Sequence, residues 1–429
     1  VDPGQLPAGQ GIDMDAKAMQ AFLDALYLRR ARGIKLGLDT VTAVLDELGR
    51  PQDDLAVVHI AGTNGKGSVA AVLDAILRQA GYRTGLYTSP HLVAFNERFR
   101  VDGEPVANDV LAGLLEEVDA AANRVAAEPA FRQPTFFEFA TAVALRHFQL
   151  AKANLVVLET GLGGRLDATN VVNPLLSVIT SIGVDHTSFL GSDPLQIARE
   201  KAGIVKPGRP VVSGVIDGNA REEIRRIASE RGSPWIDATE AVSVQRLHQD
   251  LDGQKIRLET AEGGYAPVRL PLLGAHQLQN AATALAAAEA LGSHTPLTVP
   301  REAVRAGLAG VRWPGRAQVM RHAPPVLLDA AHNPAGARAL RTLLRELFRD
   351  RPVGLVVGMA LDKDIHEFMQ VMAPVAKRCW TVPLDNSRSA DPNLLADLAR
   401  AGGAEAEAGS LAGAMVAAEA WADRAGGGV

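Results

Sequence analysis

One glycine-rich segment limits the fold of this chain more than any other feature. An uninterrupted apolar run, residues 56–61, leads directly into Gly62-Thr-Asn-Gly-Lys-Gly-Ser68, and apolar residues then recur at helical spacing from Val69. In such a strand–loop–helix unit the glycines let backbone N–H groups face an anion, and the helix N-terminus adds positive potential. The segment therefore predicts an α/β chain with a phosphate-binding loop at the end of a buried strand.

Two side chains of this loop suit a nucleoside triphosphate. Lys66 can reach the outer phosphates, and the Ser68 hydroxyl can coordinate Mg²⁺. The spacing departs from the common phosphate-loop pattern, because only two residues separate Gly62 from Gly65 and a glycine stands between the lysine and the serine. A plain glycine-rich turn is the alternative. The flanking strand and helix, and a lysine in a chain with only nine lysines among its 44 basic residues, favour a bound nucleotide.

The composition excludes several classes of protein. Apolar residues make up 47% and charged residues 22% of the 429 residues, as in ordinary globular proteins of two to three domains. The net charge of −5 does not indicate a surface for duplex nucleic acid. No apolar run reaches the roughly 18 residues of a membrane-spanning helix, and residues 1–20 lack the pattern of a signal peptide. The single cysteine, Cys379, excludes an intrachain disulfide and a multi-cysteine metal site. The chain is therefore predicted to be cytoplasmic, with no nucleic-acid or membrane partner.

Apolar strands alternate with helical segments along most of the chain, which predicts an α/β fold with a mostly parallel sheet. Between residues 240 and 272, alternation with glycine turns predicts antiparallel hairpins instead. The sequence Trp-Pro-Gly-Arg at 313–316 cannot continue a helix and predicts a linker. We therefore expect a large phosphate-loop domain, residues 1–311, and a smaller Rossmann-like α/β domain, residues 312–429. The chain ends in Gly-Gly-Gly-Val, and we expect a final strand of the pattern to be absent from this sequence.

Polar side chains stand where predicted strands end. Glu159 ends one apolar strand, and Asp185 and His186 end the next, so all three belong at the carboxyl edge of the sheet, where such folds bind ligands. Beside a phosphate loop, Glu159 is predicted to be a magnesium ligand rather than a plain exposed glutamate. Because Mg²⁺ prefers oxygen, a histidine ligand would require a further anionic partner.

Two other groups have open interpretations. Lys201 lies on a predicted helix and is either a functional lysine or a surface lysine paired with Glu200. In the second domain Asp329 and His332 follow a strand, and Asn333-Pro334 opens a helix. These residues either face a nucleotide across a cleft between the domains or form only a helix-capping turn.

Several longer segments together resemble the folylpolyglutamate synthase/dihydrofolate synthase family, whose members are relatives of the Mur peptide ligases. The resemblance runs from about residue 34 to the end of the chain, and the unusual phosphate-loop spacing is normal in this family. TSPHL followed by FNER marks the folate branch. The segments are HIAGTNGKGSV (59–69), TSPHLVAFNERFRVDG (88–103), PTFFEF (134–139), LETGLGGRLDATN (158–170), ITSIGVDH (179–186), REKAGIVKPG (199–208), GAHQLQNAATAL (274–285), WPGR (313–316) and LLDAAHNP (327–334).

The resemblance implies sites for ATP, two Mg²⁺ ions and a folate. The ATP site would lie between the two domains and consist of Thr63, Asn64, Gly65, Lys66, Gly67, Ser68, Asn280, Arg316, Asp329 and His332. The metal ligands would be Ser68, Ser89, Glu159, His186 and Lys201, with Lys201 carrying CO₂ as a carbamate that supplies the anionic oxygen. The folate's pteridine would contact Thr135, Phe136, Phe137, Glu138, Leu166, Asp167 and Ala168. The catalytic residues would be Lys66, Lys201 and His332.

The activity implied by the resemblance is ATP-dependent ligation of L-glutamate to a folate, with dihydropteroate as an open second acceptor. The acceptor carboxylate attacks the γ-phosphate of ATP, and glutamate then attacks the acyl phosphate, which gives ADP and phosphate. The protein would be a monomer and use no redox cofactor.

Two alternatives remain open at this point. A Mur-type ligase for a UDP-linked precursor would carry a separate domain before the phosphate loop, but only about 60 residues precede Gly62, too few for an α/β domain of usual size. A nucleotide-binding switch without ligase activity is the other alternative. The intact Lys66, Glu159, His186 and Lys201 argue against it.

Overall fold

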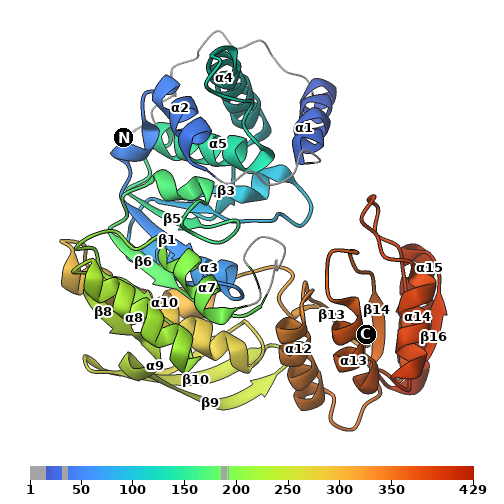
Figure 1. Ribbon diagram of the computed structural model, residues 1–429. Coiled ribbons are helices and arrows are strands. Elements are labelled where there is room, and N and C mark those ends of the chain that lie inside the picture. The colour runs from blue at the N-terminus through green and yellow to red at the C-terminus, as the bar shows by residue number, and fades with distance from the viewer. Residues whose placement is uncertain (1–15, 31–36, 185–190, 192) are drawn as a thin grey trace. The chain divides into compact units, whose positions relative to one another are not determined.

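The structure, a computed structural model, describes residues 16–30, 37–184, 191 and 193–429 (Figure 1). Contacts between Cα atoms divide the chain into two units. The first unit comprises Val1–Ala238 and Ala284–Gly307, and the second comprises Thr239–Thr283 and Leu308–Val429. The division of domains predicted at residues 311 and 312 lies close to the change of unit at Leu308, but the contacts also group residues 239–283 with the C-terminal part. The predicted domain boundaries stay a prediction.

An eight-stranded sheet forms the centre of the first unit. Its strands lie in the order β4-β3-β2-β5-β1-β6-β7-β8. The six strands from β2 to β8 pair in parallel, and β3 and β4 are antiparallel additions at one edge. The predicted mostly parallel sheet is therefore confirmed. The bounds are β1 Val57–Ala61, β2 Thr84–Tyr87, β3 Phe99–Val101, β4 Glu104–Pro105, β5 Leu155–Glu159, β6 Leu176–Ile179, β7 Val211–Ser213 and β8 Trp235–Asp237.

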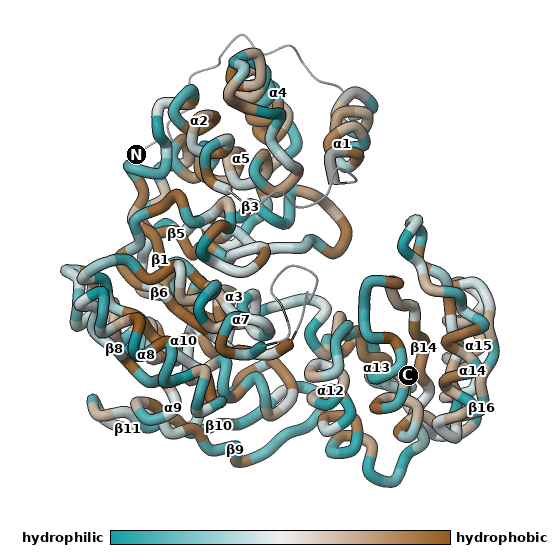
Figure 2. The backbone as a smooth tube through the Cα atoms, in the orientation of Figure 1, coloured by the Kyte–Doolittle hydropathy of each residue, from teal (hydrophilic) through white to brown (hydrophobic). Residues whose placement is uncertain are grey.

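The strands at the centre of this sheet are buried along their whole length. Every residue of β1, β5 and β6 is buried, as expected for parallel strands covered by helices, and much of the tube near them is brown, hence apolar, in Figure 2. One core joins β1 and β5 to α2, α4 and α5, and another joins β6 and β7 to α7 and α8. The helices with most of their residues in this unit are α1 Ala16–Arg30, α2 Asp39–Glu47, α3 Lys66–Gln79, α4 Asn108–Ala127, α5 Phe136–Leu150, α7 Pro194–Ala202, α8 Gly218–Glu230, α10 Ala275–His294 and α11 Arg301–Gly310.

The second unit combines an antiparallel sheet with a small α/β layer. The predicted hairpins between residues 240 and 272 are confirmed as β9 Val242–Asp250, β10 Gly253–Thr260 and β11 Gly263–Leu270. β12 Gln318–His322 and β13 Pro325–Leu328 form a two-stranded sheet. β14 Gly354–Val357, β15 Arg378–Thr381 and β16 Glu405–Ala408 pair in parallel. The helices are α9 Ala238–Ala241, α12 Pro334–Leu347, α13 Ile365–Met372, α14 Pro392–Ala401 and α15 Leu411–Ala425.

The last residues of the chain already pair as the start of a strand. Gly428 bridges Val353 in parallel, and Val429 exchanges backbone hydrogen bonds with Pro325 and Leu327 of β13. The expectation that no part of a final strand is present is therefore wrong. Hydropathy could not reveal this pairing, because three of the four terminal residues are glycines.

None of the helices in the described part of the chain combines the length and the apolar character that crossing a bilayer requires.

Candidate functional site

The glycine-rich loop lies between β1 and α3, as predicted, and the end of β6 holds it in place. Asn64 contributes a backbone N–H to Ser181 Oγ at 2.9 Å, and its carbonyl accepts the Thr180 hydroxyl at 2.7 Å. A Cβ at Gly62 would overlap the Thr180 hydroxyl, so only glycine fits there. The loop is thus fixed at the carboxyl ends of two neighbouring parallel strands, where open α/β sheets bind their ligands.

Two lysine side chains meet at one carbonyl of this loop. Lys66 Nζ donates to Gly62 O at 2.9 Å and to Thr63 O at 3.2 Å. Lys201 Nζ, from α7, donates to the same Gly62 O at 2.9 Å. Lys201 is buried, and Glu200 pairs with Arg165 at 2.9 Å instead. The alternative of a surface lysine paired with Glu200 is therefore wrong.

The predicted metal ligands Ser89 and Glu159 come together at the ends of β2 and β5. Glu159 is buried, and its Oε2 accepts the backbone N–H of Ser89 at 3.0 Å. Ser68 is buried in the first turn of α3. His186, with Asp185, lies outside the described residues. Within the described ranges, no three His, Cys, Asp or Glu side chains form a group that could hold a metal ion, so any site here depends on the serine and lysine groups as well.

The predicted folate segment 135–138 opens α5. Thr135 Oγ1 accepts the N–H of Glu138, and Glu138 accepts the N–H of Thr135 at 2.7 Å, which is a capping box. Arg132 adds a bidentate ion pair to the same buried carboxylate. Phe136 is buried and stacks on Tyr27 with ring centroids 5.3 Å apart. Glu138 therefore has its hydrogen-bonding capacity largely taken up by the chain itself.

The second folate segment is joined to the first through Phe137. A Cβ at Gly161 would come within 2.5 Å of the Phe137 ring, so the backbone at Gly161 lies directly on this half-buried aromatic ring. Asp167 is buried and accepts the N–H groups of Gly161 at 2.9 Å and Leu162 at 2.8 Å. Burial raises the pKa of Asp167, although these donors partly oppose the shift. The carboxylate thus holds the shape of the loop, and Leu166 beside it is only half-buried.

This loop is also locked against the helix that carries Lys201. A Cβ at Gly164 would come within 2.7 Å of Glu200 O and 2.8 Å of Lys201 O. The N–H of Arg165 donates to Glu200 O at 2.8 Å. The position of Lys201 at Gly62 therefore depends on the close approach of the loop backbone to the end of α7.

We expect Gly164→Ala to impair catalysis, because the added methyl group must push α7 and Lys201 away from the phosphate loop. Overpacking of this kind costs about 1–3 kcal/mol of stability, and the catalytic efficiency should fall at least about tenfold, as misplaced groups lose much of their effect. Urea unfolding and steady-state kinetics measure both. Gly113→Ala is the matched control, since its Cβ would meet nothing within 4 Å on α4. Full activity in Gly164→Ala would show that Lys201 does not need this contact.

The predicted nucleotide residues of the second unit form a compact turn. Asp329 accepts the N–H groups of Ala317 and Ala331, both at 2.8 Å. The N–H of Ala330 donates to Gly315 O at 2.9 Å, which brings the WPGR turn to the end of β13. Asn333, not Asp329 or His332, caps α12, since its Oδ1 accepts the N–H of Gly336. The exposed His332 contacts the carbonyl of Ala330 at 2.9 Å.

Asn280 reaches this unit through the start of α10. Its side chain donates to Gln277 Oε1 at 2.9 Å. Burial lowers the pKa of the nearby His276, and Asp329 and Arg316 are the charged groups that act on it. The start of α10 therefore lies near the WPGR turn. His276 belongs to the GAHQLQN segment but is not among the predicted site residues.

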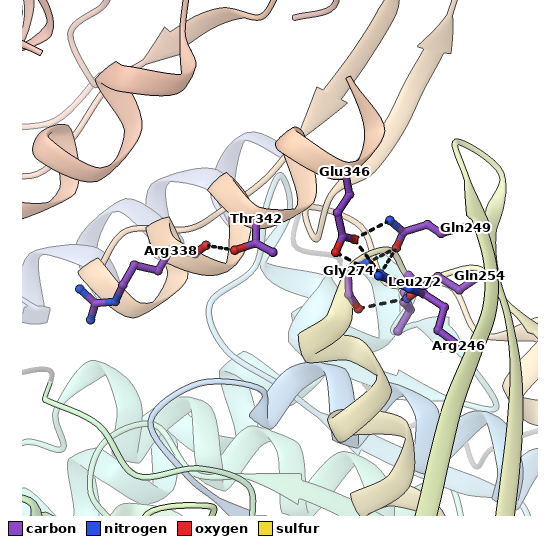
Figure 3. A network of polar contacts seen from close by, with 8 residues as sticks. All are labelled: Arg246, Gln249, Gln254, Leu272, Gly274, Arg338, Thr342 and Glu346. Carbon is purple, nitrogen blue, oxygen red and sulfur yellow. Dashed lines mark hydrogen bonds and ion pairs between the residues drawn. The ribbon is translucent and has the colours of Figure 1, made fainter. Parts of the chain in front are cut away.

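A polar network ties α10 to β9 and α12 within the second unit (Figure 3). Gly274 donates its N–H to Gln249 Oε1 at 3.1 Å, and Gln249 Nε2 donates to Glu346 at 3.2 Å. Arg246 forms a bidentate ion pair with Glu346 at 2.7 and 3.0 Å. Figure 3 also shows Gln254 donating to the carbonyls of Leu272 and Gly274. The elements that carry Asn280 and His332 are therefore held together.

Comparison with known proteins decides the family. A model of the Mur ligase middle domain matches residues 60–288, and a model of the Mur ligase glutamate ligase domain matches residues 315–426. A dihydrofolate synthase/folylpolyglutamate synthase of Bacillus subtilis is 36% identical over 373 residues, 86% of each chain. The protein of that name in Escherichia coli is 35% identical over 89% of this chain and 85% of its own. The chain belongs to the folylpolyglutamate synthase/dihydrofolate synthase family.

The solved structures of this family also share the fold. A Mycobacterium tuberculosis folylpolyglutamate synthase complexed with ADP and AMPPCP matches with a TM-score of 0.88 and 34% identity, over 95% of this chain and 93% of that chain. The E. coli protein in complex with DHPP and ADP matches with a TM-score of 0.82, also at 34% identity, over 93% of this chain and 91% of that chain. The predicted family and fold class are therefore confirmed.

Proposed function

We propose that this protein joins L-glutamate to a folate in a reaction that converts ATP to ADP and phosphate. The observation that carries the proposal is the convergence of Lys66 and Lys201 on the Gly62 carbonyl, in a phosphate-type loop at the sheet edge. Relatives named folylpolyglutamate synthase and dihydrofolate synthase support it. Solved relatives also include one described with Mn, AMPPNP and L-glutamate bound. These comparisons favour the folate branch over a ligase for UDP-linked precursors and over a nucleotide switch.

The reaction would proceed in two steps on this chain. The folate carboxylate attacks the γ-phosphorus of ATP, the bond to the bridging oxygen breaks, and an acyl phosphate and ADP form. The amino group of glutamate then attacks the acyl carbon, loses a proton and expels phosphate, which leaves an amide. Backbone N–H groups of residues 63–68 bind the phosphates, and the Lys66 ammonium offsets the negative charge that both reactants bring.

The donor atoms at the sheet edge fit Mg²⁺. Glu159 offers a buried carboxylate whose Oε2 is held by the Ser89 N–H, and the Ser68 hydroxyl lies in the first turn of α3. These are hard oxygen donors, which Mg²⁺ prefers. We assign Ser68, Ser89 and Glu159 to one ion, and Glu159, His186 and a carbamylated Lys201 to a second. When bound, the ions would neutralise charge on the transferring phosphoryl group.

The meeting of two lysines at one carbonyl supports the carbamate. Lys66 Nζ and Lys201 Nζ both lie 2.9 Å from Gly62 O, so the two nitrogens lie within twice that distance of each other. Two ammonium ions so close repel, and the effect is stronger for a buried group. Addition of CO₂ to the neutral Lys201 amine releases a proton and forms an N–COO⁻ group. This group is anionic, and its remaining N–H can still donate to Gly62 O.

The remaining assignments follow the two units. Asn280, Arg316, Asp329 and His332 are proposed to contact ATP, with Asp329 also holding the turn that presents Arg316. The pteridine is proposed to bind at Thr135–Glu138 and Leu166–Ala168, where Glu138 and Asp167 shape the backbone. The location of ATP between the two domains, the monomeric state and the cytoplasmic location stay predictions.

The deciding experiment measures ADP release by the purified protein with acceptor and glutamate varied independently. We expect release that requires Mg²⁺, L-glutamate and either a reduced folate or dihydropteroate. Comparing the two acceptors shows which one the protein prefers. Release with a UDP-linked precursor instead would favour a Mur-type ligase, and ATP binding without acceptor-dependent turnover would favour a switch.

Arg316→Ala should raise the KM for ATP by about 10- to 100-fold, which corresponds to the loss of a hydrogen bond to a charged group. The melting temperature should change little, because Arg316 donates only to the neighbouring Gly315 carbonyl, at 3.2 Å, among its described contacts. Initial rates at varied ATP and a thermal scan test this. Arg312→Ala, which removes an exposed arginine four residues away, is the control. Unchanged ATP kinetics in Arg316→Ala would remove Arg316 from the nucleotide site.

A further inference from the structure

His59 is a fully buried histidine in the middle of β1, three residues before the phosphate loop. Its Nε2 lies 2.8 Å from the hydroxyl of Thr169, a residue 110 positions away. Val57, which points to the same face of the strand, belongs to the apolar core around α5. The sheet therefore places an imidazole among apolar side chains, directly against η3 (Ala168–Val171), the 3₁₀ helix that follows the predicted pteridine segment.

The hydrogen bonds around Thr169 determine which nitrogen of His59 carries the proton. A threonine hydroxyl has one hydrogen, and the Thr169 hydroxyl donates it to Asp167 Oδ1. His59 Nε2 must therefore be the donor to Thr169. Nδ1 is then an unprotonated acceptor, and it has no hydrogen-bond partner in the described part of the chain. Burial, with a smaller effect of Lys206, lowers the pKa of His59 to about 3, so the ring is neutral at physiological pH.

The chain of hydrogen bonds continues from Thr169 into the loop. Asp167 Oδ1 also accepts the N–H of Thr169, and its Oδ2 accepts the N–H groups of Gly161 and Leu162. These residues follow Glu159, the proposed metal ligand, almost immediately. A single donor in the core thus sets the orientation of a hydroxyl, then of a carboxylate, and then of the backbone on both sides of it.

Stability alone does not account for this histidine. A buried nitrogen without a partner is costly, and an apolar side chain of similar size would avoid that cost. The imidazole is instead matched to the single acceptor position that remains on Thr169.

We propose that His59 is a positioning residue for the folate acceptor: its Nε2–H orients the Thr169 hydroxyl, which fixes Asp167 and the loop of residues 160–169. This inference rests on the proposed function, because it assigns that loop to the acceptor. His59 itself touches neither substrate.

The test compares His59→Leu with His59→Gln, whose amide N–H can occupy the place of Nε2–H. His59→Leu should raise the KM for the folate acceptor at least about tenfold, while the KM for ATP changes less than about twofold. His59→Gln should retain an acceptor KM within about threefold of the parent protein. The melting temperature of His59→Leu should stay the same or rise, which separates positioning from a structural role.

Thr169 supplies the second half of the experiment. Thr169→Val removes the hydroxyl at nearly constant volume and should raise the acceptor KM as His59→Leu does, whereas Thr169→Ser should not. In the double variant His59→Leu/Thr169→Val the effects should not add, because both break the same chain. Additive effects, equal increases in both KM values, or a His59→Gln variant as impaired as His59→Leu would overturn the proposal.

Amide hydrogen exchange gives a readout that does not depend on activity. The N–H groups of Gly161 and Leu162 should exchange faster in His59→Leu than in the parent protein or in His59→Gln, while amides of β15 should be unchanged. Unaltered exchange at both residues would refute the coupling. Failure of the parent protein to release ADP with acceptor and glutamate would refute the proposed function instead, and the exchange result would still decide whether His59 holds the loop.

Discussion

Lys66→Ala should lower the rate of glutamate ligation by about 10³-fold, the size of effect seen when a group that stabilises transition-state charge is removed. The half-buried ammonium donates to the carbonyls of Gly62 and Thr63, and it belongs to the loop that is proposed to bind the triphosphate. An alanine cannot replace that charge. Because the lysine contacts loop carbonyls rather than the apolar core, the free energy of unfolding should fall by no more than about 1 kcal/mol.

The measurement is single-turnover ADP formation together with urea unfolding. Lys255→Ala serves as the control, since Lys255 is an exposed lysine on the antiparallel strand β10. The control should match the parent protein in both assays. Near-normal turnover in Lys66→Ala would remove the assignment of a phosphate-binding loop, and a large loss of stability would leave the lysine with a structural role instead.

Lys201→Ala should lose most activity, since it removes both the amine and any carbamate formed on it. In the parent protein, depletion of CO₂ should lower activity, and bicarbonate at mildly alkaline pH should restore it, because only the neutral amine adds CO₂. Bicarbonate should not rescue Lys201→Ala. Burial of Lys201 should protect the adduct, and metal binding would hold it further.

The modification itself has a direct signature. Protein equilibrated with ¹³C-bicarbonate should show a carbamate carbon resonance that is absent from Lys201→Ala and present in Lys255→Ala. A crystal of the metal-loaded protein whose electron density ends at the ammonium nitrogen would refute the carbamate. Full activity of Lys201→Ala would refute any role for the residue.

Features that depend on local sequence were predictable. The phosphate loop follows from an apolar strand, closely spaced glycines and a helical pattern, all within about fifteen residues, and the structure places it between β1 and α3. The parallel strands follow from short uninterrupted apolar runs, because a strand covered on both faces needs no polar side. The hairpins after residue 240 follow from alternation and glycine turns.

The role of several site residues was not predictable, because it depends on which partner reaches a side chain first. Glu138 and Asp167 are carboxylates in segments expected to bind the pteridine, but their oxygens accept hydrogen bonds from backbone N–H groups, and in Glu138 also from Arg132. A carboxylate that can satisfy nearby backbone donors and one that faces a ligand look the same in a sequence. His59 is invisible for a similar reason, since its partner lies 110 residues away.

The sequence by itself determined the α/β class, the phosphate loop, the antiparallel insertion and, through its motifs, the family. Each of these is encoded by residues close together in the chain, where spacing and side-chain type leave little choice. Only the tertiary structure decided that Lys201 is buried at Gly62, that Gly164 must be small to allow it, and that the last residues pair with β13. Those outcomes depend on packing between segments more than a hundred, and in one case only about forty, residues apart, and no local pattern records which surfaces will meet.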